Sequence, residues 1–338
     1  MMRRLRICLP RVLFLTFLSL LLVTSGNGQG RKNRAAPTPP SCTSRTGLHC
    51  EMYGSGDPIL FLHGLGGSTY SWRYMIAPLK GQYQVILIDL RGQGQSPKPK
   101  DKNYSIIEQG KLVQQFIVEK NLRKLILVGN SYGGAVSILV AIKLLEQPQS
   151  RLAKLVLIDS GGYPDHLPDF LKILRTPVLG WLAVHLLPPK LQILIVLHKS
   201  YYDPAKITKQ QIKAYAKPIS ERGGRHALLQ LGKQAIPDDI QEWIDKYPTI
   251  SVPTLILWGE DDRVLPRLIG ERLHKAIPNS TMHLINFAGH IPQEEEPDAV
   301  VCQIKKFLMP GINCPLPDQK RGKEKGEGVK GKGERAKR

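Results

Sequence analysis

The sequence lacks the residue spacings that mark a zinc site. Its five cysteines include no Cys-x-x-Cys pair, and its nine histidines form no His-Glu-x-x-His segment. Both patterns place metal ligands on one short segment, so their absence leaves a metal site without support. The fragment Gly92-Gln-Gly94 also lacks the third glycine and the following helix of a nucleotide-binding loop. We therefore predict no metal and no other cofactor.

The chain also lacks an uninterrupted apolar run of the roughly 20 residues that span a bilayer. Its first long apolar stretch, Val12–Val23, follows several arginines and is followed by Thr24, Ser25 and Gly26. This order is typical of a secretory signal. Residues 1–28 are therefore predicted to be a signal peptide, with an uncleaved signal anchor as the alternative. The protein is expected to be exported, either periplasmic or secreted, and membrane-anchored if the segment remains.

Acidic residues are scarce at both ends of the chain. The first 34 residues carry seven Arg or Lys and no acid, and residues 319–338 carry nine against three Glu, so the ends supply +13 of the formal charge of +20. Residues 311–338 contain no apolar periodicity and are predicted to be a basic disordered tail. Interspersed Glu residues and a lack of aromatics favour a solvated tail over nucleic-acid binding. Contact with an anionic lipid surface stays open as an alternative.

Cysteines are few, but the exported part would hold an even number of them: Cys42, Cys50, Cys302 and Cys314. An oxidising compartment allows disulfides, and four cysteines permit three connectivities. Pairing Cys42 with Cys50 and Cys302 with Cys314 is the most local of these.

The middle of the chain alternates between short apolar runs and stretches with helical spacing. The expected strands are Ile59–Leu62, Val85–Leu90, Leu125–Val128, Leu155–Ile158, Leu255–Trp258 and Met282–Asn286. Continuous apolar strands that alternate with helices predict an α/β fold with a mostly parallel sheet covered on both faces. We assign residues 48–162 and 248–310 to this core, and the Pro-, Arg- and Ser-rich residues 29–47 to a linker. Ligands of such sheets bind at the carboxyl ends of the strands.

The alternation stops at residues 163–247, where leucine-rich helical stretches broken by prolines replace strands. The apolar stretch Val178–His198 is divided by Pro188, Pro189 and Lys190 into pieces too short to cross a membrane. We interpret residues 163–247 as an apolar helical lid inserted between two core strands.

One serine stands at a predicted turn between a strand and a helix. Gly129-Asn-Ser131-Tyr-Gly133 follows the strand Leu125–Val128 and precedes a helical run. Flanking glycines permit the close backbone contacts of such a bend, which exposes the serine at the carboxyl edge of the sheet. The motif alone is weak, and its neighbours decide its meaning.

Four segments, in the same order along the chain, resemble motifs of the α/β-hydrolase family, in its serine-nucleophile, esterase- or lipase-like branch with a helical lid. They are His63-Gly-Leu-Gly-Gly67, Asp89-Leu-Arg-Gly-Gln-Gly-Gln-Ser96, the turn around Ser131, and the pair Gly259-Glu-Asp-Asp262 with Ala288-Gly-His290. The resemblance covers about residues 48–309 and implies the α/β-hydrolase fold.

A serine hydroxyl needs a base to take its proton, and imidazole has a pKa near neutrality. His290 follows the last expected strand, and the order Ser131, acid, His290 is the order of this fold. Family spacing from Gly259 favours Asp262 as the acid that orients His290. Asp261, facing solvent or capping the next helix, and Asp159, at the end of the strand before the lid, are the alternatives.

The tetrahedral intermediate of acyl transfer needs two backbone N–H donors. One is expected from Tyr132, the residue after the nucleophile, and the other from Leu65, with Gly66 as the alternative. His63, Arg91 and Ser96 are expected to hold turns near the site by hydrogen bonds.

Ester hydrolysis through an acyl-enzyme is the default reaction for a serine at this turn. The apolar lid favours a lipophilic small-molecule ester or lipid as substrate, with peripheral membrane contact as a further expectation, and the sequence carries no sign of oligomeric state. The Gly-Asn-Ser turn also occurs in relatives that hydrolyse carbon–carbon bonds of ring-fission diketones. Those relatives usually have His-Gly-Gly-Gly-Pro and a tryptophan where this chain has His63-Gly-Leu-Gly-Gly and Ile291. Peroxidase-like chemistry without a cofactor and a non-catalytic binding protein are the remaining alternatives.

Overall fold

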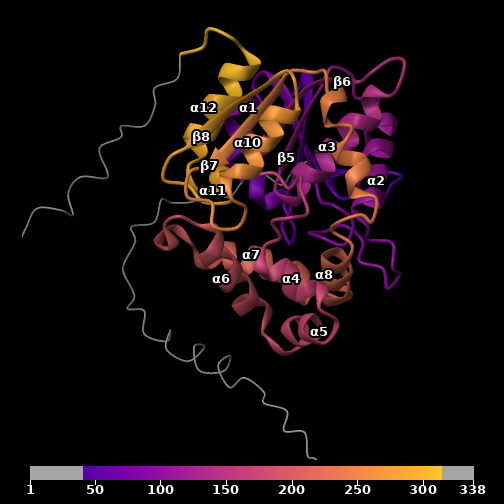
Figure 1. Ribbon diagram of the computed structural model, residues 1–338, viewed down its shortest axis with the longest axis vertical. Coiled ribbons are helices and arrows are strands. Elements are labelled where there is room, and N and C mark those ends of the chain that lie inside the picture. The colour runs from indigo at the N-terminus through magenta and orange to yellow at the C-terminus, as the bar shows by residue number, and fades with distance from the viewer. Residues whose placement is uncertain (1–40, 314–338) are drawn as a thin grey trace, which may run out of the picture. The chain divides into compact units, whose positions relative to one another are not determined.

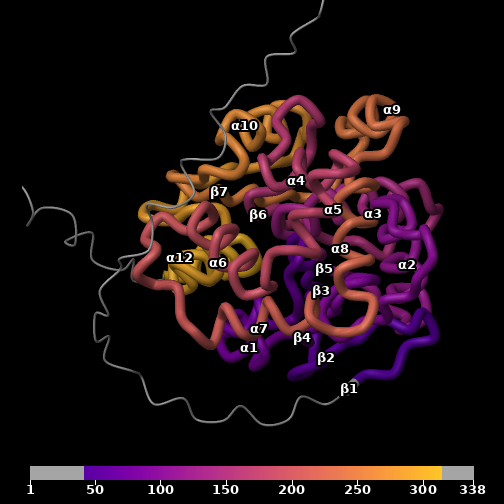
Figure 2. Tube along the Cα trace, turned by 90° about the horizontal axis from the view of Figure 1, so that it is seen from below, coloured from indigo at the N-terminus to yellow at the C-terminus, as the bar shows by residue number. Residues whose placement is uncertain are grey.

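The computed structural model describes residues 41–313, and within this range the chain forms one eight-stranded sheet. The strands are β1 (Ser41–Cys42), β2 (Cys50–Tyr53), β3 (Asp57–Leu62), β4 (Tyr83–Ile88), β5 (Leu125–Asn130), β6 (Leu152–Ile158), β7 (Thr254–Gly259) and β8 (Ser280–Ile285). Their order in the sheet is β1-β2-β4-β3-β5-β6-β7-β8, and the labels in Figure 2 follow it from β1 to β7. β1 pairs antiparallel with β2 and β2 with β4, whereas all other pairs are parallel. The predicted fold class is confirmed.

Helices cover both faces of the sheet because its central strands are apolar on both. In β3, Ile59 and Phe61 belong to the core on one face, whereas Leu60 and Leu62 belong to the core on the other. The first face packs against α1 (Arg73–Leu79) and α12 (Pro297–Leu308), and the second against α2 (Ile106–Glu119), α3 (Tyr132–Leu145) and α10 (Arg267–Ala276). This burial explains why the strand sequences lack the alternation of a half-exposed sheet.

Part of the segment assigned to the linker forms regular structure. Ser41 and Cys42, assigned to the linker, form β1 and pair with Glu51 and Cys50 of β2. A disulfide joins Cys42 to Cys50 and closes the loop between these two strands. Cys302 is buried in α12, and Cys314 lies outside the described residues, as do the expected signal segment 1–28 and most of the basic tail.

The chain between β6 and β7 is an insertion without strands. Its elements are α4 (Asp169–Arg175), α5 (Pro177–Leu186), α6 (Pro189–Ser200), η2 (Pro204–Lys206), α7 (Lys209–Ser220), α8 (Gly224–Lys233), α9 (Ile240–Ile244) and η3 (Tyr247–Thr249). Helices α4 to α8 gather below one end of the sheet in Figure 1. No single helix among the described residues is long and apolar enough to span a membrane; α5 and α6 together reach the required length and composition but are bent by 112°.

Candidate active site

Ser131 occupies a strained turn between β5 and α3. Its backbone has φ 55° and ψ −118°, a conformation that residues with a side chain rarely adopt. The neighbouring glycines make the turn possible, since a Cβ on Gly133 would lie 2.2 Å from the carbonyl oxygen of Leu62. The side chain of Ser131 is thereby held at the carboxyl end of the parallel strands, as the sequence predicted.

The structure brings Ser131, His290 and Asp262 into one hydrogen-bonded row. Ser131 Oγ lies 2.7 Å from His290 Nε2, and His290 Nδ1 lies 2.8 Å from Asp262 Oδ2. The second carboxylate oxygen of Asp262 accepts the N–H groups of Val264 at 2.7 Å and Leu265 at 3.0 Å. A carboxylate held in this way can fix the ring and its tautomer and stabilise an imidazolium.

Neither alternative acid is hydrogen-bonded to the ring of His290, whose two nitrogens contact Ser131 and Asp262. Asp261 is joined to the histidine loop through its backbone N–H, which donates to Ala288. Asp159 is fully buried behind Asp262, and its Oδ1 accepts the N–H of Gly259 at 2.8 Å. Burial, followed by the neighbouring Asp262 carboxylate, holds the pKa of Asp159 well above its ordinary value, so this carboxyl keeps its proton to a higher pH.

Asp159, Asp262 and His290 form the one group of possible metal ligands found among residues 41–313, with a ligand atom of each within 4.8 Å of the others. Both ring nitrogens of His290 already contact Ser131 and Asp262. The arrangement therefore suits proton transfer between Ser131 and His290 better than coordination of a cation.

The loop that carries His290 is held from two sides. Asn130, next to the serine, donates both N–H groups of its amide, to the carbonyls of Ile158 at 3.1 Å and His290 at 3.2 Å. Glu295 of α11 (Pro292–Glu295) accepts the N–H of Gly289 at 2.8 Å. These bonds limit the movement of the imidazole relative to Ser131.

Glu295 also ties this loop to the helical insertion. Its carboxylate accepts the N–H groups of Tyr202 at 3.0 Å and Asp203 at 2.7 Å. The backbone N–H of His290 in turn donates to the carbonyl of Ser200 at 2.7 Å. Burial raises the pKa of Glu295 even though its three N–H partners oppose this change.

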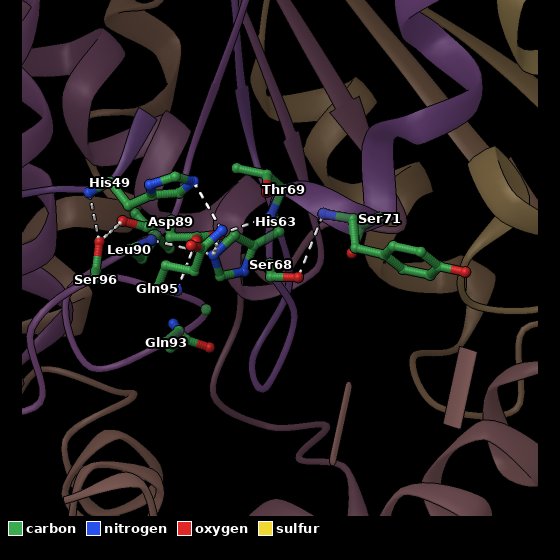
Figure 3. Close-up of polar contacts among 12 residues, drawn as sticks. His49, His63, Ser68, Thr69, Ser71, Asp89, Leu90, Gln93, Gln95 and Ser96 are labelled. Atoms are coloured by element: carbon green, nitrogen blue, oxygen red, sulfur yellow. Dashed lines mark hydrogen bonds and ion pairs between the residues drawn. The ribbon is translucent and has the colours of Figure 1, made fainter. Parts of the chain in front are cut away.

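A buried polar network shapes the loop after β3 (Figure 3). Asp89 accepts the N–H groups of Thr69 at 2.6 Å and Gln95 at 2.7 Å. His63 Nδ1 donates to Gly64 and its Nε2 accepts the N–H of Leu90, which assigns the neutral tautomer. Burial lowers the pKa of His63, in agreement with that neutral form.

Arg91 and Ser96 hold the turn after β4. Arg91 pairs with Asp101 at 2.5 Å, and Ser96 Oγ donates to the carbonyl of Asp89 at 2.5 Å while accepting the N–H of His49. Both side chains are therefore placed as the sequence predicted, in turns beside the site.

The same network bears on the candidate oxyanion donors. The N–H of Gly66 donates to Gln93 Oε1 at 2.6 Å, so Gly66 is engaged in holding the loop. Leu65, which borders the cavity beside Ser131, and Tyr132, at the first position of α3, stay the predicted pair of oxyanion donors.

Two apolar chambers meet at Ser131. The first chamber extends under α3 and is lined by residues that include Ile106, Ile138, Leu139, Leu167 and Leu171. The second chamber lies on the side of His290 and is lined by residues that include Ile193, Val196, Leu197 and Ile291. Leu65, Ser131 and Phe170 border both chambers, and none of the described lining residues is a Lys, Arg, Asp or Glu.

Comparison with known families decides the broader identity. Residues 59–303 match the profile of the Alpha/beta hydrolase family. The chain is an α/β hydrolase. The match spans both halves of the core and the insertion between them, and it includes Ser131, Asp262 and His290.

Curated relatives of this hydrolase differ in their reactions. An uncharacterized hydrolase of Bacillus subtilis is 29% identical, over 74% of this chain and 89% of the relative. A 2-hydroxy-6-oxononadienedioate/2-hydroxy-6-oxononatrienedioate hydrolase of Cupriavidus pinatubonensis is 27% identical, over 77% of this chain and 90% of the relative. Lipase 3 of a Moraxella species is 28% identical, over 71% of this chain and 74% of the relative. The family is therefore shown, and the bond that this hydrolase cleaves has to be argued from its own site.

Two residues that shape the site of this hydrolase carry no signal in the sequence. Gln93 occupies a variable position of the Asp89–Ser96 motif, and Glu295 is the middle one of three consecutive Glu residues. Their contacts with Gly66 and Gly289 join segments that only the folded chain brings together.

Proposed function

We propose that this hydrolase cleaves a lipophilic carboxylic ester through an acyl-enzyme on Ser131. The observation that carries the proposal is the position of Ser131 Oγ, which is hydrogen-bonded to His290 and stands where two apolar chambers meet. An ester has one group on each side of its carbonyl carbon, and two chambers accommodate both. Burial of apolar surface in them contributes about 25 cal/mol per Å².

The roles of the triad residues in the proposed reaction follow from their positions. His290 Nε2 takes the proton of Ser131 as its oxygen attacks the ester carbonyl, and the N–H groups of Leu65 and Tyr132 stabilise the oxyanion. The C–O bond then breaks, and the alcohol leaves with the proton from His290. Water, activated by the same imidazole, releases the acid and restores Ser131. Asp262 keeps the ring oriented in both steps.

The direction of the substrate follows from the proton transfer. The leaving alcohol receives its proton from His290, which lines the second chamber and not the first. The alcohol part therefore occupies the second chamber, and the acyl chain occupies the first.

A p-nitrophenyl ester series from acetate to palmitate tests the proposal. We expect kcat/KM to rise by up to about fourfold for each methylene that enters the first chamber, and to fall once the chamber is full. Leu139→Trp narrows the first chamber and should shift the optimum to shorter chains. An unchanged optimum in this variant would remove the acyl chain from the first chamber, and a lack of turnover on every ester would contradict ester hydrolysis itself.

Carbon–carbon hydrolysis is the second candidate, and the Cupriavidus relative together with Asn130 favours it. The named substrates of that relative are dioates and carry carboxylates. A buried carboxylate without a counter-charge costs several kcal/mol, and the described lining of both chambers offers no Lys or Arg. Ester hydrolysis is therefore the better fit.

A non-catalytic binding protein would not need the hydrogen bond between Ser131 and His290. Reaction with a serine-directed phosphonate tests this alternative, because labelling requires an activated serine.

We further propose that the insertion acts as a lid that contacts an anionic lipid surface. The outer sides of α5 and α6 expose large apolar residues: Val178 (72% exposed), Trp181 (51%), Leu186 (67%), Leu191 (41%) and Ile195 (43%). Ile193 and Leu197, on the opposite side of α6, line the second chamber. A helix that is apolar on all sides is stable where its outer face is also covered.

Charge on this part of the insertion fits an anionic surface. Residues 170–202 contain no Asp or Glu and four Lys or Arg. Asp169, at their border, pairs with Lys172 at 3.4 Å and Lys199 at 2.9 Å, so a net positive charge remains. Basic residues near an anionic bilayer contribute about 1 kcal/mol each.

Vesicle sedimentation tests this contact. The protein is expected to bind vesicles of phosphatidylglycerol at least about tenfold more tightly than vesicles of phosphatidylcholine. Val178→Asp with Leu186→Asp should weaken binding at least about tenfold, because charged side chains resist burial in lipid. Val118, exposed to 48% on α2, offers a matched control as Val118→Asp. Equal binding to both lipids, or full binding by the double variant, would contradict the proposal.

A further inference from the structure

The second chamber borders a buried chain of polar side chains that the proposed reaction does not use. Ser71, in the helical turn η1 (Thr69–Trp72), and Tyr215, on α7, both line this chamber. Their hydroxyl oxygens are 2.7 Å apart. The hydroxyl of Tyr215 also contacts Glu294 Oε1, and Glu294 itself does not line the chamber.

Glu294 fixes the direction of these hydrogen bonds. Its side chain is fully buried and pairs with Arg73 at 2.5 Å, while Gln211 Nε2 donates to it at 2.7 Å. A carboxylate beside a guanidinium accepts hydrogen bonds and has none to donate. Tyr215 therefore donates to Glu294, and burial beside this carboxylate holds the pKa of Tyr215 above its ordinary value, which keeps the phenol protonated.

The direction continues to Ser71. The single hydroxyl proton of Tyr215 is used in the hydrogen bond to Glu294, so the Tyr215 oxygen accepts a hydrogen bond from the hydroxyl of Ser71. Ser71 Oγ is left with a lone pair and without a proton for a ligand. It thus offers the chamber a hydrogen-bond acceptor.

The other polar side chains around the second chamber also use their protons in other hydrogen bonds and offer acceptors to a ligand. Asn130 uses both amide N–H groups on the carbonyls of Ile158 and His290, so its oxygen is the atom left for a ligand. Ser200 Oγ donates to Val196 at 2.8 Å. Apart from the catalytic row and its oxyanion donors, the side chains that border this chamber present acceptors within an apolar wall.

We propose that the second chamber binds an alcohol group that carries a free hydroxyl, so that the preferred substrate is a lipophilic monoester of a diol or polyol. The free hydroxyl donates to Ser71 Oγ, and the carbon skeleton of the alcohol contacts Ile193, Leu197 and Ile291. An ether or a second ester at the same place brings only acceptors and leaves the lone pair of Ser71 Oγ without a donor. This inference rests on the proposed ester hydrolysis and adds the identity of the alcohol.

The inference is tested with two esters that differ only in that a methyl group replaces the proton of the free hydroxyl. We expect kcat/KM for 2-hydroxyethyl laurate to exceed that for 2-methoxyethyl laurate by about five- to tenfold, the effect of one hydrogen bond between partly buried groups. Ser71→Ala removes the acceptor and should bring this ratio close to one. Ser220→Ala is the matched control, because Ser220 Oγ donates to Ala216 on the same helix as Tyr215 and does not line the chamber, and its ratio should equal that of the wild type.

The outcomes separate the two proposals. A wild-type ratio near one, in a protein that hydrolyses p-nitrophenyl esters, overturns the hydroxyl site and leaves ester hydrolysis standing. A ratio that Ser71→Ala leaves unchanged overturns the assignment to Ser71. Absence of turnover on every ester overturns both proposals together.

Discussion

Replacing Ser131 by alanine is expected to lower kcat for ester hydrolysis by about 10⁴-fold or more. His290 and Asp262 would remain in place, but no covalent acyl-enzyme could form. Residual turnover would come from the oxyanion donors and the chambers alone. The measurement is the initial rate on p-nitrophenyl butyrate at equal protein concentration, together with labelling by a serine-directed phosphonate.

Ser137 provides the matched control for this loss. It is a buried serine on α3, six residues after Ser131, and its hydroxyl donates to the carbonyl of Gly133 at 2.7 Å. Because it does not border either chamber, Ser137→Ala should retain kcat within a few-fold of the wild type. Wild-type rates in Ser131→Ala, or equal losses in both variants with unchanged circular dichroism spectra, would remove Ser131 from the reaction.

Asp262→Asn is expected to lower kcat by about 10⁴-fold while leaving the fold intact. An amide at this position can donate to His290 Nδ1, which selects the tautomer whose proton is on Nε2 and prevents that nitrogen from accepting the proton of Ser131. KM should change little, because Asp262 lies outside both chambers. Steady-state kinetics across a range of pH measures the effect.

Asp159→Asn separates the two buried acids. Because the pKa of Asp159 is raised, an amide resembles its protonated form, and we expect kcat within about tenfold of the wild type.

The pH dependence of stability gives a second test of Asp159. The raised pKa lets Asp159 stabilise the fold below about pH 4, and this contribution is lost as pH rises through the folded pKa. The free energy of unfolding of the wild type should therefore fall relative to that of Asp159→Asn as pH increases. A kcat loss in Asp159→Asn equal to that in Asp262→Asn would transfer the orienting role to Asp159.

The sheet and the row of site residues could be predicted because short segments carry their signals. Leu125–Val128 is apolar throughout, and Gly133 marks the bend that holds Ser131. Chain order then singled out His290, and the spacing from Gly259 singled out Asp262. The structure places both within hydrogen-bonding distance of the expected partner.

The antiparallel edge could not be predicted, because its segments resemble loops. β1 is two residues long and β2 is four, with Glu51 facing the polar network around Thr69. A short edge strand is stabilised by its neighbours and by the Cys42–Cys50 disulfide rather than by its own composition. The contacts of Ser71 and Glu294 with Tyr215 could not be predicted either, because Ser71 and Glu294 are more than 200 positions apart in the sequence.

The attachment of the insertion to the histidine loop limits how this enzyme can be recombined. Exchange of the insertion with that of a relative would normally be designed with two junctions, near residues 163 and 247. Here Ser200, Tyr202 and Asp203 form a third point of attachment, through the backbone of His290 and the carboxylate of Glu295. A chimaera needs to carry matching residues at this third junction, or its imidazole loses part of its support even when both splice sites are sound.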